Sequence, residues 1–158
     1  MSDVKKEYEP LKKKYGLPDY DKLDDEFELL YIGEIKEIKF PLRFIRRRIN
    51  DKIAMVCNMI QTLLQPNPGS VINLQEAGFL EKEEKNKYSE LLKNLMIIER
   101  TSLALDLNFD EVGDAEFIKD NYNRWLEAKD DIMKLTDKLI DGWKKLEIKR
   151  EQRNHYFG

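Results

Sequence analysis

The chain has 158 residues, of which 41% are hydrophobic and 37% are charged, and its formal net charge is −3. This length suits one domain, which we place at residues 1–150, followed by a charged and aromatic tail at 151–158. The hydrophobic fraction is sufficient for a core, and the charged fraction is above average and typical of long helices with solvated faces. A slightly acidic chain is not an obvious general binder of polyanions.

The sequence also favours one cellular location. Cys57 is the only cysteine, so a disulfide within the chain is impossible, and a reducing compartment fits. The N-terminal segment has no apolar stretch of the signal-peptide type, and no run approaches the roughly 18 apolar residues of a membrane span. We therefore expect a cytoplasmic protein that does not bind membranes.

The first predicted helix lies before Gly16 and Pro18, which together are a helix-stop signature. Its apolar residues recur at helical spacing, at Val4, Tyr8, Leu11 and Tyr15. Proline is tolerated in the first turn of a helix but not in its interior. Because of Pro10, we expect the ordered helix to begin near Glu9.

A second, acidic helix is predicted to begin near Asp19 or Asp21. The segment 29–40 that follows admits two interpretations, a continuation of the helix or a strand. Apolar residues at helical spacing favour the helix, whereas Gly33 weakens it. Pro41 then requires a kink or a new helix, because the residue before a proline is driven towards extended geometry.

The segment 40–66 is the one around which the rest of the chain is organised. Its apolar residues follow one helical face in steps of four and three, at Ile45, Ile49, Ile53, Val56, Ile60 and Leu63. The second half of the segment is apolar almost all round, which indicates a helix covered from several sides. The loop 65–70, with two prolines and a glycine, ends it.

Three further helices are predicted after this loop. A short helix ends at Gly78, and Asn73 with Glu76 forms a capping-box pattern at its start. A long helix over 81–107 follows, with an apolar face made by Leu91, Leu92, Leu95, Met96, Ile98, Leu103 and Leu105. The last helix begins at Ala115, with Asp114 as its cap, and runs to about Arg150.

Together these elements predict an all-α fold. We expect a mostly antiparallel bundle of four main helices, with one or two short helices and a long C-terminal helix. The expected helix content is above roughly 65%, about double that of an average globular protein.

Several carboxylates fall on apolar helix faces, where acids are rarely found. Two interpretations remain open, a buried ion network and a metal site of the di-iron type. The second also needs Glu-x-x-His pairs, and His155 in the tail is the only histidine, so the ion network is favoured. Its predicted members are Glu34, Glu99, Asp106, Arg46 and Arg48.

Other chemistry finds little support in the sequence. Cys57 and His155 are the only candidates for a nucleophile and its base, and one lies on an apolar helix and the other in the tail. The seven glycines are scattered singly, so no phosphate-binding loop exists. We therefore assign no catalytic, cofactor-binding or metal-binding residue and do not expect an enzyme. A carboxylate-based metal enzyme is the third hypothesis for the function.

The first hypothesis is an interaction or scaffold protein that presents apolar helix surface to a protein partner or to a second copy of itself. Trp143 and Leu146 continue the apolar stripe of the last helix past the point where a shorter neighbour would cover it. Exposed apolar surface of this kind marks interfaces. The predicted interface is this end of the helix together with Tyr156 and Phe157.

The second hypothesis is a helical protein that associates with nucleic acid. Arg43 and Arg47 point away from the apolar stripe of the central helix, one turn apart, and Lys52 lies close by. Outward-facing arginines can bind phosphate groups. The competing interpretation is a solvated face whose arginines pair with nearby acids.

Overall fold

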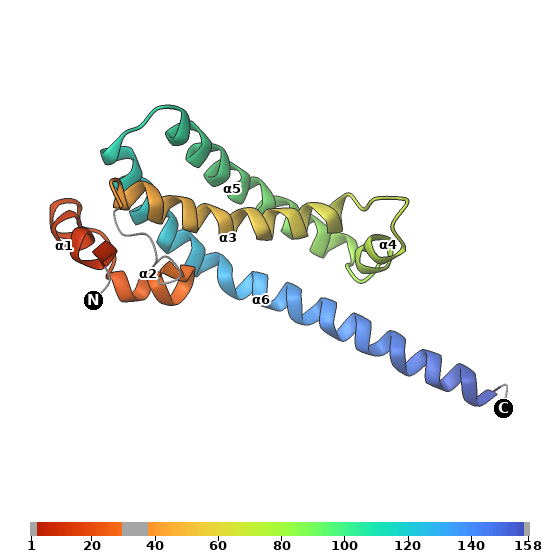
Figure 1. Cartoon of the computed structure of the whole chain (residues 1–158). Coiled ribbons are helices and arrows are strands. Elements are labelled where there is room, and N and C mark those ends of the chain that lie inside the picture. Colours follow the sequence, from red (N-terminus) through yellow and green to blue (C-terminus); the bar gives the residue numbers. More distant parts are fainter. Residues whose placement is uncertain (1–2, 30–37, 157–158) are drawn as a thin grey trace. The chain divides into compact units, whose positions relative to one another are not determined.

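The structure is a computed structural model that describes the backbone of residues 3–29 and 38–156 and the side chains of 4–29 and 38–146. These residues form six helices and no strand, and the helix content is 84% (Figure 1). The helices are α1 (Asp3–Tyr15), α2 (Tyr20–Phe27), α3 (Pro41–Leu64), α4 (Val71–Ala77), α5 (Lys82–Leu107) and α6 (Glu111–Tyr156). The all-α prediction is confirmed, and the antiparallel order of four main helices stays a prediction. None of the helices in these ranges is long and apolar enough to cross a membrane.

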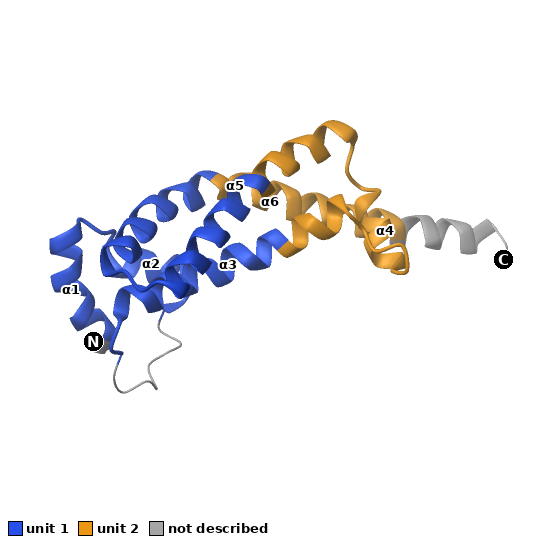
Figure 2. Ribbon diagram, turned by 90° about the horizontal axis from the view of Figure 1, so that it is seen from above, with its two compact units in different colours: residues 1–57, 93–127 blue, residues 58–92, 128–158 orange. Residues whose placement is uncertain are grey.

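The chain groups into two compact units, drawn in blue and orange in Figure 2. Unit 1 comprises residues 1–57 and 93–127, and unit 2 comprises residues 58–92 and 128–158. Each of α3, α5 and α6 contributes residues to both units. The single domain expected from the sequence stays a prediction. Part of the predicted tail, residues 151–156, has helical backbone, because α6 extends to Tyr156.

The core of unit 1 is built on the apolar stripe of α3, as its spacing predicts. Ile45, Ile49 and Ile53 of this stripe are fully buried, and Pro41 begins the helix, where its fixed backbone angle is favourable. Side chains from the other segments of the unit complete the core, among them Tyr8, Leu23, Phe27, Leu95, Ile98, Ile118 and Trp125.

The predicted start of α1 near Glu9 is wrong. The helix begins at Asp3 and contains Pro10 in its interior, where the ring costs one backbone hydrogen bond. Burial of Val4 and Tyr8 upstream offsets this cost, and the Tyr8 hydroxyl donates a hydrogen bond of 2.7 Å to the Pro18 carbonyl. Tertiary contacts therefore extend the helix past a residue that would otherwise set its start.

The acidic helix α2 is shorter than one interpretation of the sequence allowed. It ends at Phe27, because Glu28 adopts a left-handed backbone conformation with φ of 54°, which stops a helix. Of the ambiguous segment 29–40, residues 30–37 lie outside the described residues.

Unit 2 corrects the predicted cap of the short helix. Ser70, not Asn73, is the N-cap of α4, and the Ser70 hydroxyl accepts a hydrogen bond of 3.3 Å from the Asn73 N–H. The helix ends at Ala77, with Gly78 as its C-cap. The buried residues of unit 2 include Ile60, Leu63, Leu80, Tyr88, Ile132, Leu135 and Leu139.

The predicted start of the last helix is also wrong. α6 begins at Glu111, because the Asp110 carboxylate accepts a hydrogen bond of 3.1 Å from the Val112 N–H and so caps the helix four residues earlier. Asp114, the predicted cap, lies in the first turn of α6 and is 1% exposed. Its side chain is thereby available for contacts inside unit 1.

Candidate functional site

The most buried charged group among the described residues of unit 1 is Arg46 on α3, which has no exposed surface. Its guanidinium donates to Asp114 Oδ1 at 2.5 Å, to the Ser102 carbonyl at 2.8 Å and to an Asp106 carboxylate oxygen. The Ser102 hydroxyl accepts a further bond from it. A buried arginine is stabilised when its donors are satisfied in this way. Arg46 therefore joins α3 to α5 and α6 within unit 1.

Two neighbouring arginines reach the same carboxylate from the outside. Arg47 Nε lies 3.0 Å from Asp106 Oδ1, and Arg43 donates to the Asp106 carbonyl at 3.0 Å. Asp106 lies in the last turn of α5, where the free carbonyls and the helix dipole favour cations. The basic start of α3 thus has a structural role, since it neutralises the C-terminal end of α5.

The two aspartates on Arg46 differ in their ionisation. Partial burial alone would raise the pKa of Asp106, but hydrogen bonds from Arg46 and Arg47 outweigh it and hold this pKa below its ordinary value. Burial raises the pKa of the Asp114 carboxyl above its ordinary value, and the bond from Arg46 offsets this only in part. One oxygen of Asp114, Oδ2, is buried without a hydrogen-bond partner.

The other described members of the predicted ion network, Glu99 and Arg48, have different partners. Arg100 donates a hydrogen bond of 3.3 Å to the Glu99 carboxylate. The same carboxylate approaches the buried Cys57 thiol, and burial together with this carboxylate raises the pKa of the thiol to about 11. Arg48 lies 3.6 Å from Asp51, on its own helix. Glu34 falls outside the described residues. Of the four predicted members that the structure describes, it brings together Arg46 and Asp106, and it adds Asp114 and Ser102.

The third residue of the predicted nucleic-acid patch, Lys52, is also engaged within unit 1. Its ammonium donates a hydrogen bond to the Glu26 carbonyl and lies 5.8 Å from the ring centre of Trp125. The Trp125 indole N–H in turn donates to the Glu26 carboxylate at 2.9 Å. All three residues of the patch thus have partners within their own unit.

The predicted interface at the end of α6 has contacts inside unit 2. The Trp143 indole N–H donates to Glu76 Oε1 at 2.8 Å, and its ring meets Phe79 edge-on at 5.7 Å. Gly142 allows this approach, because a side chain there would come within 2.7 Å of the Phe79 ring. Leu146 is half-buried, whereas the side chains of Tyr156 and Phe157 lie outside the described ones.

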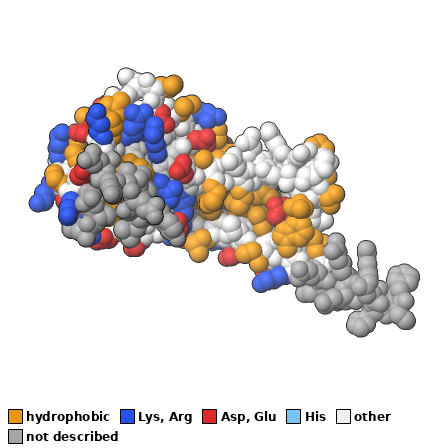
Figure 3. All heavy atoms as spheres, viewed as in Figure 1, with side chains coloured by type: hydrophobic (Ala, Val, Ile, Leu, Met, Phe, Trp, Pro, Cys, Tyr) orange, Lys and Arg blue, Asp and Glu red, His pale blue; other side chains and the backbone are white. Residues whose placement is uncertain are grey.

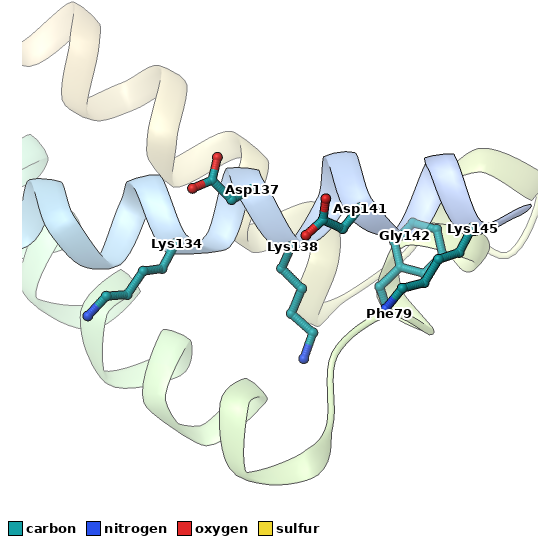
Figure 4. A pocket seen from close by; sticks show the side chains of 7 residues that line it. All are labelled: Phe79, Lys134, Asp137, Lys138, Asp141, Gly142 and Lys145. Carbon is teal, nitrogen blue, oxygen red and sulfur yellow. The ribbon is translucent and has the colours of Figure 1, made fainter.

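A surface hollow of about 430 Å³ lies beside these aromatic residues in unit 2 (Figure 4). Its lining on α6 contains both signs of charge, since Lys134, Lys138 and Lys145 occur there together with Asp137 and Asp141. Lys138 is paired with Glu84 of α5. Opposite charges of this kind do not select a ligand of one sign.

The second half of α5, within unit 1, is apolar on two opposite sides. One side follows Leu95, Ile98 and Ser102, and all three are at most 3% exposed. The other side carries apolar side chains that are exposed to solvent, Ile97 by 55%, Leu103 by 50% and Leu107 by 82%. We call this second side the outer face of α5, and it consists of Ile97, Arg100, Leu103, Ala104 and Leu107.

The outer face was missed by the sequence analysis, although its signal is present in the sequence. Ile97, Ala104 and Leu107, with Arg100 between them, follow one another in steps of three and four, just as the buried side does. Leu103 was assigned to the buried face and belongs to the outer one. A helical wheel gives two apolar sides here but not which of them a neighbouring helix covers.

Within the described residues, no group of three or more His, Cys, Asp or Glu side chains is placed to hold a metal ion. Comparison of the chain with protein-family models, with curated proteins and with solved structures found no match.

Proposed function

We propose that this chain is a non-enzymatic interaction protein and that the outer face of α5 is the surface it presents to a protein partner. The observation that carries the proposal is the exposure of Ile97, Leu103 and Leu107 on one side of a helix whose opposite side is buried. Exposed leucines scattered singly are ordinary, whereas a contiguous apolar surface is typical of an interface.

An exposed aromatic residue also follows the end of α5. Phe109, in the turn between α5 and α6, is 45% exposed, and its ring packs against that of Phe40 at 4.7 Å. Arg43 lies over the Phe109 ring at 5.7 Å. Rigid aromatic residues held by their neighbours lose little conformational freedom on binding, which suits them to an interface.

The end of α6 is less suited to this role than the sequence suggested. The indole N–H and the ring of Trp143 already have partners in Glu76 and Phe79. Binding through Trp143 would require these contacts to be shared or broken. The outer face of α5 requires no such change, because its apolar side chains are already exposed.

The alternative function, association with nucleic acid, would use Arg43, Arg47 and Lys52. These groups could neutralise only about three phosphates, and a patch of that size would give a shallow dependence of affinity on salt. The contacts of Arg43 and Arg47 with Asp106 reduce the positive charge available to phosphates. We therefore place this function second. We further propose that the protein acts in the cytoplasm, in line with its single buried thiol.

Site-specific photocrosslinking in living cells tests the proposed function. A photoreactive amino acid is placed at Ile97, in the outer face, and separately at Glu116, an exposed position on α6 of the same unit. We expect discrete covalent adducts from position 97 and none from position 116. Adducts should be lost when Leu103→Gln and Leu107→Gln are combined, because glutamine keeps helix propensity and removes the apolar surface.

The result that would overturn the proposal is equally direct. Adducts at position 97 that persist in the double glutamine variant would not depend on the apolar face. Equal labelling from positions 97 and 116 would indicate random collisions and would remove the reason for assigning the face a partner.

A further inference from the structure

We infer that the partner segment of the outer face is an amphipathic helix whose apolar stripe is bordered by Asp and Glu side chains. This inference rests on the proposed function and specifies the chemistry of the partner. It is argued from two ion pairs beside the exposed leucines, in which Arg100 and Arg47 are more exposed than the carboxylates that they contact.

Arg100 lies within the outer face itself. Its side chain is 62% exposed, whereas that of its neighbour and ion-pair partner Glu99 is 25% exposed. The surface between Ile97 and Leu103 therefore presents the guanidinium more than the carboxylate. Surface pairs of this type are weak, so Arg100 can exchange its partner for a carboxylate of another protein at little cost.

At the edge of the face near Asp106, an arginine is again more exposed than the carboxylate that it contacts. Arg47 is 53% exposed, and Asp106, which it contacts, is 32% exposed and shared with Arg43 and the buried Arg46. Arg46 is buried and also paired with Asp114, so the surface here carries two arginines, Arg43 and Arg47, beside the single carboxylate of Asp106. On the face seen in Figure 3, hydrophobic side chains lie among both basic and acidic side chains over unit 1.

The length and shape of the surface fit a helical partner. From Ile97 to Leu107 the face follows one side of α5 for ten residues, or about 15 Å at the usual rise. Residues of a partner helix at steps of three and four would meet this stripe, as in other helix-to-helix recognition. Acidic residues beside the partner's stripe would then lie opposite Arg100 and Arg47.

A second copy of the chain fits this surface less well. Two outer faces placed together would bring Arg100 and Arg47 of each copy into one interface, and the carboxylates that come with them, Glu99 and Asp106, are less exposed than these arginines. Like charges facing each other across an interface cost binding free energy. The positive border thus favours a different, acidic chain as the occupant.

The test uses the full chain and two synthetic helical peptides of roughly 20 residues, long enough to form helix in isolation. Both carry the same leucine stripe, which is flanked by Glu in one peptide and by Lys in the other. Fluorescence anisotropy at low salt should show that the Glu-flanked peptide binds at least about tenfold more tightly. Raising the salt concentration should shrink this preference, because exposed charges are screened.

Two sets of variants identify the residues responsible. Arg100→Glu should reduce or reverse the preference for the Glu-flanked peptide, whereas Arg124→Glu, an exposed arginine on α6, should leave it unchanged. The pair Leu103→Gln and Leu107→Gln should abolish binding of both peptides. Circular dichroism of each variant confirms that it is folded.

The outcomes separate this inference from the proposed function. Equal binding of both peptides, lost in the glutamine pair, would overturn the acidic preference and leave the proposed interface intact. Dimers in sedimentation equilibrium that dissociate in the glutamine pair would identify a second copy as the occupant and would also overturn the inference. Failure of the Glu-flanked peptide to bind would overturn it as well. Peptide binding that the glutamine pair does not change would contradict the proposed function itself.

Discussion

The two sides of α5 within unit 1 are both apolar, but one is buried in the core and the other is exposed to solvent. The buried side packs Leu95 and Ile98 into the core and receives Arg46 at Ser102. The outer side exposes Ile97 and Leu107 to solvent, although these residues are as apolar as their buried counterparts. Burial of apolar surface stabilises a fold only where a neighbour covers it. One helix thus carries both residues that define the fold and residues that are available for a partner.

The largest effect is expected on the buried side, at its polar contact. Arg46→Ala should lower the free energy of unfolding by about 3–5 kcal/mol, because Asp114 would remain buried without its cation. Arg47→Ala is the matched control, since Arg47 contacts the same Asp106 but is 53% exposed. It should cost less than about 1 kcal/mol. Urea unfolding of both variants measures the difference, and an equally small loss in both would show that the buried network does not stabilise unit 1.

The apolar residues on the two sides should differ next. Leu95→Ala should destabilise the protein by about 2–5 kcal/mol, because Leu95 is 2% exposed and its removal leaves a cavity. Leu107→Ala removes the same atoms from a residue that is 82% exposed and should change stability by no more than about 0.5 kcal/mol. Thermal unfolding and urea unfolding both measure the difference in stability between the two variants. A large loss for Leu107→Ala would mean that the outer face is part of the core.

A smaller effect concerns the aspartates on Arg46. The pKa of Asp106 lies below its ordinary value of 3.8, so its contribution to stability is present above pH 3.8 and is lost as the pH falls through the lower native pKa. The pKa of Asp114 lies above 3.8, so its contribution is present below pH 3.8 and is lost as the pH rises through the higher native pKa.

The two asparagine variants should therefore change the pH dependence of the free energy of unfolding in opposite directions. Asp106→Asn should flatten the rise of the free energy of unfolding with pH, and Asp114→Asn should steepen it. Unfolding by urea at several values between roughly pH 3 and 6 covers the range in which aspartates titrate. The same change of slope in both variants would contradict the opposite pKa directions.

Local patterns in the sequence predicted much of the fold and little of the site. The stripe of α3 and the loop before Ser70 were clear because spacing and proline content act locally. Pro10 led to a wrong predicted start of α1, because the burial of Tyr8, which extends the helix, is a tertiary effect. Asp114 was wrongly predicted as a helix cap for a related reason. Only the position of Arg46 in space distinguishes a buried ion pair from a helix cap.

The outer face shows the same limit most clearly. The spacing of Ile97, Ala104 and Leu107 is visible in the sequence, but exposure depends on which side of α5 the neighbouring segments cover. Composition cannot supply that information, because both sides carry branched apolar residues. The distinction between a core residue and an interface residue appears only once the segments of the unit are packed.

Stability and contact with a partner can be measured in one and the same variant. The variant with Leu103→Gln and Leu107→Gln carries a photoreactive residue at position 97, and both urea unfolding and crosslinking in cells are recorded. We predict a free energy of unfolding within about 1 kcal/mol of that of the parent protein, since both leucines are at least half exposed, together with loss of the adducts. A loss of several kcal/mol, or adducts that persist, would contradict the assignment of the outer face of α5 to a partner.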